Sequence, residues 1–149
     1  MDKKFKQFFE SEGLTVDGNS AYGNLYGYEV SFAYRKFDSV SPVQVLIACY
    51  TTDEQKRLID DELRKKAYKF LRWQFTRYGL FVGINGMTLG SVLKKLDDLI
   101  VGICDVLKLG GALGVGYCPV CGSELTADSQ AYTVEKFFKV TMGNDCAGD

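Results

Sequence analysis

The sequence predicts an α+β fold, in which an antiparallel sheet carries helices on one face and a small β-hairpin follows at the C-terminus. Residues 28–34 and 71–76 alternate apolar and polar side chains, which is typical of strands with one buried face. An apolar stripe that repeats every 3.6 residues runs from Leu89 to Leu107 and predicts a long helix. Helices and strands are grouped along residues 1–110 rather than alternating one by one, so we expect the order αβββαββα.

The first half is expected to contain one helix and three strands. Residues 3–12 place three phenylalanines on one helical stripe, and Gly13 is suited to end that helix. Residues 14–27 are rich in Gly, Asn and Tyr and predict a short strand and a turn. Residues 43–50 form an apolar run that predicts a buried strand. Between them, the alternating strand 28–34 is expected to bury Tyr28, Val30, Phe32 and Tyr34.

The second half begins with a helix whose N-cap is expected to be Thr51 or Thr52. The buried stripe of that helix is predicted to be Leu58, Ile59, Leu63 and Ala67. The next two strands flank a turn at Gly79 and form a hairpin that should bury Leu71, Trp73 and Phe75. Thr88 is the expected N-cap of the long helix, and Gly110–Gly111 should end it.

Composition excludes several classes of function. The chain of 149 residues is 46% hydrophobic with a formal net charge of −1, which indicates a globular protein and argues against a phosphate-binding surface. It contains no histidine, the most common general base, so we expect no enzymatic activity. Five cysteines without a secretory signal indicate a reducing, cytoplasmic location. Cys49 and Cys104 lie in apolar runs and are predicted to be core residues.

The segment CPVCG, residues 118–122, carries the most informative chemistry. Cys118 and Cys121 have the spacing of a metal-binding turn, and Gly122 allows the positive φ that such a turn needs. Thiolates favour zinc, which would act structurally here. Cys146, separated from Cys121 by residues 122–145, is the predicted third ligand. Asp149 is the predicted fourth ligand, with Asp145 or a group from a second copy of the chain as alternatives.

Two other interpretations of these features stay open. A thiol-redox pair would need its first cysteine at the start of a helix within a βαβ unit, and the sequence around Cys118 predicts neither. A nucleic-acid-binding surface is suggested by aromatic and basic residues that are interspersed along residues 65–78. The alternation there places Trp73 and Phe75 opposite Arg72, as in an ordinary strand with a buried face, so a nucleic-acid partner is not expected.

The order αβββαββα with its long last helix resembles the type III secretion chaperone-like fold, which a bacterial family of sensory-transduction regulators also adopts. That resemblance implies a non-catalytic binding module with a protein partner, often a homodimer. CPVCG looks like one knuckle of the zinc-ribbon family. The whole arrangement resembles small bacterial membrane-associated proteins in which a CPxCG ribbon and a later lone cysteine precede transmembrane helices. A membrane is therefore expected only if the natural chain continues beyond residue 149.

These observations divide the chain into three predicted parts. Residues 1–110 form an α+β binding domain, residues 111–116 a glycine-rich linker, and residues 117–149 a zinc-ribbon-like appendage. The predicted function is that of a non-enzymatic protein-binding or regulatory module with a structural zinc site. The alternatives are a nucleic-acid-binding ribbon protein and a thiol-redox protein.

Overall fold

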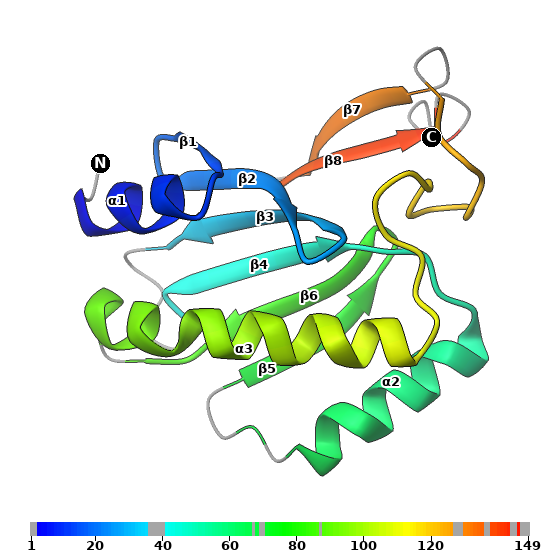
Figure 1. Cartoon of the computed structure of the whole chain (residues 1–149), viewed down its shortest axis with the longest axis horizontal. Coiled ribbons are helices and arrows are strands. Elements are labelled where there is room, and N and C mark those ends of the chain that lie inside the picture. The colour runs from blue at the N-terminus through cyan, green and yellow to red at the C-terminus, as the bar shows by residue number, and fades with distance from the viewer. Residues whose placement is uncertain are drawn as a thin grey trace.

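The computed structural model describes residues 3–35, 41–66, 68, 71–86, 88–126, 130–135, 138–143 and 146, and it confirms the α+β class. Its main sheet is antiparallel and six-stranded, with the order β1-β2-β3-β4-β6-β5 (Figure 1). The strands are β1 Thr15–Asp17, β2 Ser20–Leu25, β3 Tyr28–Tyr34, β4 Val43–Ala48, β5 Leu71–Thr76 and β6 Gly79–Ile84. The helices are α1 Lys3–Ser11, α2 Asp53–Lys65 and α3 Leu89–Leu109. A separate hairpin consists of β7 Gln130–Glu135 and β8 Phe138–Gly143.

The N-terminal part of the sheet contains one strand more than the sequence pattern predicted. Residues 14–27 form both β1 and β2, which pair as a hairpin with Asp17 opposite Ser20. Gly18 adopts a φ of 61°, a left-handed conformation that glycine accepts readily and that closes this tight turn. The prediction of one short strand and a turn therefore missed the second strand of this segment.

One face of the sheet packs against all three helices and is called here the helix-covered face. Figure 1 shows α3 lying across the sheet, with α1 near its first turns and α2 near its last. The predicted alternation in β3 is confirmed, because Tyr28, Val30 and Phe32 are buried in this core and Tyr34 packs against it. In α2 the predicted Ile59 and Leu63 are buried, but Leu58 is 54% exposed, and Ala67 lies outside the described residues. A position one residue away is rotated by about 100° on a helix, which turns Leu58 out of the narrow stripe.

Both predicted helix starts are formed by threonine. Thr52 Oγ1 accepts a hydrogen bond from the Gln55 N–H at 3.2 Å, and the Gln55 side chain accepts one from the Thr52 N–H at 2.9 Å. Thr88 and Ser91 form the same reciprocal pair at α3. These capping boxes satisfy amide groups that have no partner within the helix.

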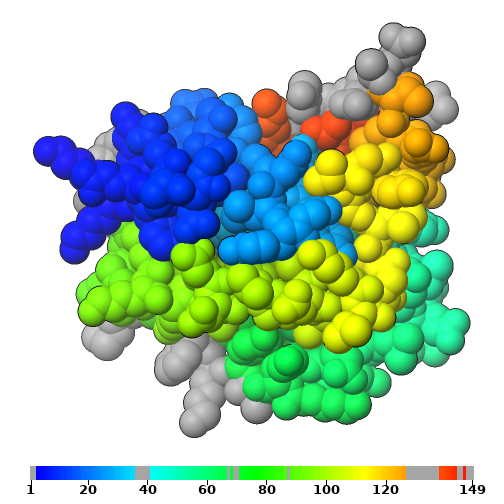
Figure 2. Space-filling view, viewed as in Figure 1, coloured from blue at the N-terminus to red at the C-terminus, as the bar shows by residue number. Residues whose placement is uncertain are grey.

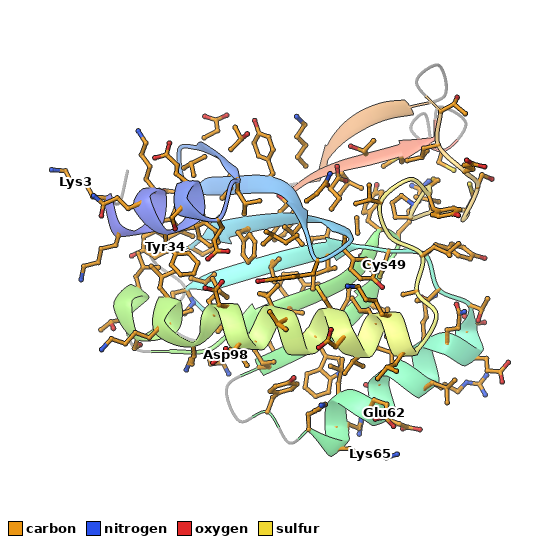
Figure 3. The ribbon with its side chains drawn as sticks, viewed as in Figure 1. Lys3, Tyr34, Cys49, Glu62, Lys65 and Asp98 are labelled. Carbon is orange, nitrogen blue, oxygen red and sulfur yellow. The ribbon has the colours of Figure 1, made fainter. Side chains whose placement is uncertain are left out.

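The charged face of α2 points away from the sheet, as Glu62 and Lys65 show in Figure 3.

The opposite face of the sheet packs in part against β8 and is called here the hairpin-covered face. Phe138, Val140 and Met142 of β8 are buried against Ala33, Leu46 and Ala48 of the sheet. Helices were predicted on one face of the sheet, and no cover was predicted for the other. Two side chains of β3 also anchor the outer edge of β8: Ser31 Oγ accepts the Lys139 N–H at 3.0 Å, and Glu29 accepts the Thr141 N–H and hydroxyl, both at 2.6 Å.

Within the ranges given above, none of the helices has a stretch apolar and long enough to cross a bilayer. The longest, α3, carries Lys94, Lys95, Asp97 and Asp98 within its sequence.

Candidate metal centre

The chain between α3 and the first cysteines is tied to one end of the main sheet. Tyr50 and Leu113 exchange two backbone hydrogen bonds of 3.0 Å, and the Val115 N–H donates to the Gly27 carbonyl at 2.9 Å. A Cβ atom at Gly114 would collide with that same carbonyl oxygen, so this close approach requires glycine. Residues 111–116, which were predicted to be a linker, thus position the following segment through backbone contacts.

Residues 118–122 form a tight turn that we call the cysteine knuckle. The Gly122 N–H donates to the Cys118 carbonyl at 2.8 Å, and the Cys118 N–H donates to the Ser123 carbonyl at 2.8 Å. Gly122 has a φ of 79°, which confirms the positive φ expected at this position. A Cβ atom on Gly122 would also lie 2.8 Å from the ring of Tyr50. Glycine is therefore needed there both for its backbone angle and for space.

The third cysteine reaches the knuckle from the far end of the hairpin. Cys146 follows β8, and the Sγ atoms of Cys118, Cys121 and Cys146 all lie within 4.8 Å of one another. Cys118 is fully buried, Cys121 is exposed and Cys146 is half-buried. The structure thus brings together the three cysteines that the sequence analysis predicted as ligands.

The three sulfur atoms fit a single metal ion. Zinc–sulfur bonds are about 2.3 Å long, so two sulfurs of one tetrahedral site lie about 3.8 Å apart. The three sulfurs, all within 4.8 Å of one another, are close enough together to hold one metal ion. Among the described residues, no carboxylate joins the three thiols. Asp149 and Asp145 lie outside the described residues, so the fourth ligand stays a prediction.

The thiols strongly affect one another's ionisation. Hydrogen bonds from the hydroxyl and backbone N–H of Ser123 lower the pKa of Cys121 to about 7. Burial, together with hydrogen bonds to Cys121 and Cys118, raises the pKa of Cys146 to about 12. The Cys121 thiol can therefore ionise near neutral pH, whereas ionisation of Cys146 is opposed by its burial and by its thiol neighbours. A bound cation would remove that opposition, because it stabilises the thiolates.

The remaining cysteines have no part in this cluster. Cys49 and Cys104 belong to the core of the helix-covered face, as the sequence predicted. Burial raises the pKa of each thiol to about 12, which keeps both protonated. Figure 3 labels Cys49 where the chain leaves β4. Since the sheet separates this core from the knuckle, neither residue can complete the metal site.

A cavity of about 400 Å³ lies beside the knuckle and was not predicted from the sequence. Its floor includes Tyr22 and Glu29 of the sheet, its walls include Tyr117 and Pro119 of the cysteine-bearing loop, and Lys139 comes from β8. Figure 2 shows the surface hollowed between β2, this loop and β8. The Lys139 ammonium lies 4.5 Å from the centre of the Tyr22 ring. In the sequence, the polar residues at alternate positions of β3 indicate that this strand has a polar face. They do not reveal which later segment of the chain covers that face.

Comparison of the chain with protein-family models, with curated protein sequences and with solved structures found no match. The resemblances to the chaperone-like fold and to zinc ribbons therefore stay predictions, and the chemistry of the site must be argued from its own residues.

Proposed function

We propose that this protein is a non-enzymatic binding or regulatory module, acting in the cytoplasm, in which a structural zinc ion fastens the C-terminal hairpin to the sheet. The observation that carries the proposal is the convergence of three sulfurs from both sides of that hairpin. Cys118 and Cys121 precede β7, and Cys146 follows β8. An ion bound to all three closes the hairpin at its base, where the local apolar core is too small to fix it alone.

Zinc is favoured because its usual structural sites are tetrahedral and rich in thiolate. The ion would draw protons from the cysteines on binding, and Ser123 already stabilises one thiolate at Cys121. The binding function is supported by the cavity beside the knuckle and by the apolar side chains at its rim. Val115 and Tyr117 line it and expose 49% and 40% of their surfaces. A protein partner, or a second copy of the chain, is the expected occupant.

The structural use of several carboxylates among the described residues supports a non-enzymatic role. The chain has no histidine. Asp60 accepts hydrogen bonds from Arg64 and from the Trp73 indole, which gives it a structural use. Asp53 and Glu62 form exposed ion pairs with lysines of the same helix.

The alternatives predicted from sequence receive less support. Trp73 and Phe75 pack against the helix-covered core rather than forming a stacking platform, which weakens a nucleic-acid-binding function. Cys118 lies in a turn and not at the start of a helix, so the helix dipole that lowers thiol pKa in many redox pairs is missing from residues 114–126.

Metal analysis of the purified full chain tests the proposal. We expect about one zinc ion per chain, lost in Cys118→Ser and kept in the matched variant Cys49→Ser, whose sulfur lies in the other core. A zinc content well below one ion per two chains, in protein purified without chelators, would contradict a structural zinc site. Co-purification of nucleic acid that high salt removes would favour the nucleic-acid alternative instead.

A further inference from the structure

The chain can supply this metal site with a limited set of ligands. Its sequence has five cysteines and no histidine. Cys49 and Cys104 are buried in the core on the other side of the sheet, so three sulfurs are the most that one chain can give. The usual protein ligands of zinc are sulfur, imidazole nitrogen and carboxylate oxygen. The fourth ligand of the ion is therefore either an oxygen atom, from a carboxylate or from water, or a group that comes from outside the chain.

An external thiolate is a better match for this ion than an oxygen atom. Three thiolates make a soft coordination environment. An ion that selects such soft ligands also favours a thiolate over an oxygen atom as its fourth ligand. The site is also accessible from solvent: Cys118 is buried beneath it, whereas Cys121 is exposed and Cys146 half-buried. An ion held by these three sulfurs can be approached from the side of Cys121.

The charge around the site also allows a fourth thiolate. Three thiolates and a divalent ion have a combined charge of −1, and a fourth thiolate brings this to −2. Arg77 lies at the rim, where its Nη2 donates a hydrogen bond to the Cys146 carbonyl at 3.4 Å. This hydrogen bond holds a positive charge next to a metal-binding cysteine, where it offsets part of the added negative charge.

We propose that the metal centre exchanges its fourth ligand and binds an external thiolate there. This inference rests on the proposed function, because it requires a loaded metal site. The exchange involves no change of oxidation state: the incoming thiol gives its proton to water, its sulfur bonds to the ion, and the oxygen ligand leaves. The thiolate comes from a small thiol compound or from a cysteine side chain of another polypeptide, including a second copy of this chain.

Cobalt substitution in the full chain tests the proposal. Co²⁺ is added to metal-free protein kept reduced by a phosphine, and 2-mercaptoethanol is then titrated, with ethylene glycol as the matched alcohol control. The sulfur-to-cobalt charge-transfer absorption should rise by about a third, as expected when three thiolate ligands become four, and should saturate at one thiol per ion. Ethylene glycol should cause no change. A cobalt spectrum that ignores the thiol up to millimolar concentrations would overturn this inference while leaving the structural metal site intact.

The absence of any thiolate–cobalt absorption before thiol is added would instead overturn the metal centre, and this inference with it. The source of the thiolate is distinguished by two further arms. A cysteine-containing tripeptide should reproduce the effect of 2-mercaptoethanol, and its serine analogue should not. If a second copy is the source, the absorption should depend on protein concentration without added thiol, and the sedimenting mass should double.

Substitutions at the rim give an independent check. Arg77→Gln should raise the half-saturating concentration of 2-mercaptoethanol several-fold, because a positive charge beside the anionic ligand is lost. Arg72→Gln, which removes an equal charge near the start of β5, the strand that Arg77 follows, should leave it unchanged. Asp149→Asn should lower that concentration or leave it unchanged, since an Asp149 oxygen would compete with the thiolate. A rise in Asp149→Asn would contradict exchange at the oxygen position.

Discussion

The helix-covered and hairpin-covered faces of the sheet are stabilised by different means. The first carries a cluster of 25 buried side chains among the described residues, contributed by three helices and the strands between them. The second carries seven, and it adds side-chain hydrogen bonds from Glu29 and Ser31 and a group of three thiols. Buried apolar area is the dominant stabilising term in folding, so the first face should hold without help and the second should depend on its polar contacts and on metal.

Truncation in each core should separate the two faces most clearly. Ile103→Ala removes a side chain that is almost fully buried beneath the sheet and should lower the free energy of unfolding by about 2–5 kcal/mol. Met142→Ala, its counterpart in β8, should chiefly release the hairpin. Native-state hydrogen exchange distinguishes them: Ile103→Ala should weaken protection throughout the sheet, and Met142→Ala mainly in β7 and β8. Equal loss of protection in α3 for both variants would show that the faces unfold as one unit.

Metal removal should expose one set of thiols and leave the other protected. With zinc chelated at pH 7.5, we expect alkylation of Cys121 within minutes, because the metal no longer masks it and its pKa is about 7, whereas Cys146, whose pKa is raised to about 12, should react more slowly. Cys49 and Cys104 have pKa values raised by burial to about 12, so at this pH they hold almost no thiolate and should react only after global unfolding. Mass spectrometry of the alkylated peptides measures both rates. Rapid modification of Cys49 on chelation would contradict a metal-independent helix-covered core.

The clamp between Glu29 and Thr141 tests how far polar contacts support the hairpin. Glu29→Gln keeps the shape of the side chain but replaces a carboxylate that accepts two hydrogen bonds of 2.6 Å. Hydrogen bonds to charged groups contribute about 1.5–3 kcal/mol each, and the amide can preserve part of this, so we expect a loss of about 1–2 kcal/mol from hairpin docking. Exchange rates of the β8 amides measure it. Glu124→Gln, in the loop after the knuckle, is the matched control and should change little.

The same contrast explains what could be predicted from the sequence. The helix-covered face follows from local patterns, because the 3.6-residue stripe of α3 and the alternation in β3 each identify the buried side chains. Thr52 and Thr88 were predicted as caps for the same reason. The cover of the other face depends on contacts between residues more than 100 positions apart, such as Glu29 with Thr141. A strand with a polar face looks solvated until its partner is known, so neither this clamp nor the cavity could be predicted. The cysteine cluster was predicted because thiol chemistry narrows the role of CPVCG without reference to the fold.

Two glycines beside the knuckle give the most local test of the hairpin-covered face. Gly116 and Gly122 both have positive φ, at 95° and 79°. A Cβ atom on Gly116 would meet no atom within 4 Å, whereas one on Gly122 would lie 2.8 Å from the Tyr50 ring. Gly116→Ala should therefore cost only the backbone strain, about 1–2 kcal/mol. Gly122→Ala should cost the same strain plus the displacement of Tyr50, and zinc affinity should fall further than in Gly116→Ala.

The double variant Gly122→Ala/Tyr50→Ala separates these two costs. With the ring removed, its zinc affinity relative to Tyr50→Ala should fall only by the factor seen for Gly116→Ala, about five- to thirtyfold if the whole strain acts on the metal-bound form. Competition with a chromophoric chelator measures each affinity. If Gly122→Ala and Gly116→Ala have equal effects in the otherwise native chain, contact with Tyr50 does not shape the knuckle. The backbone angle alone would then account for glycine at position 122.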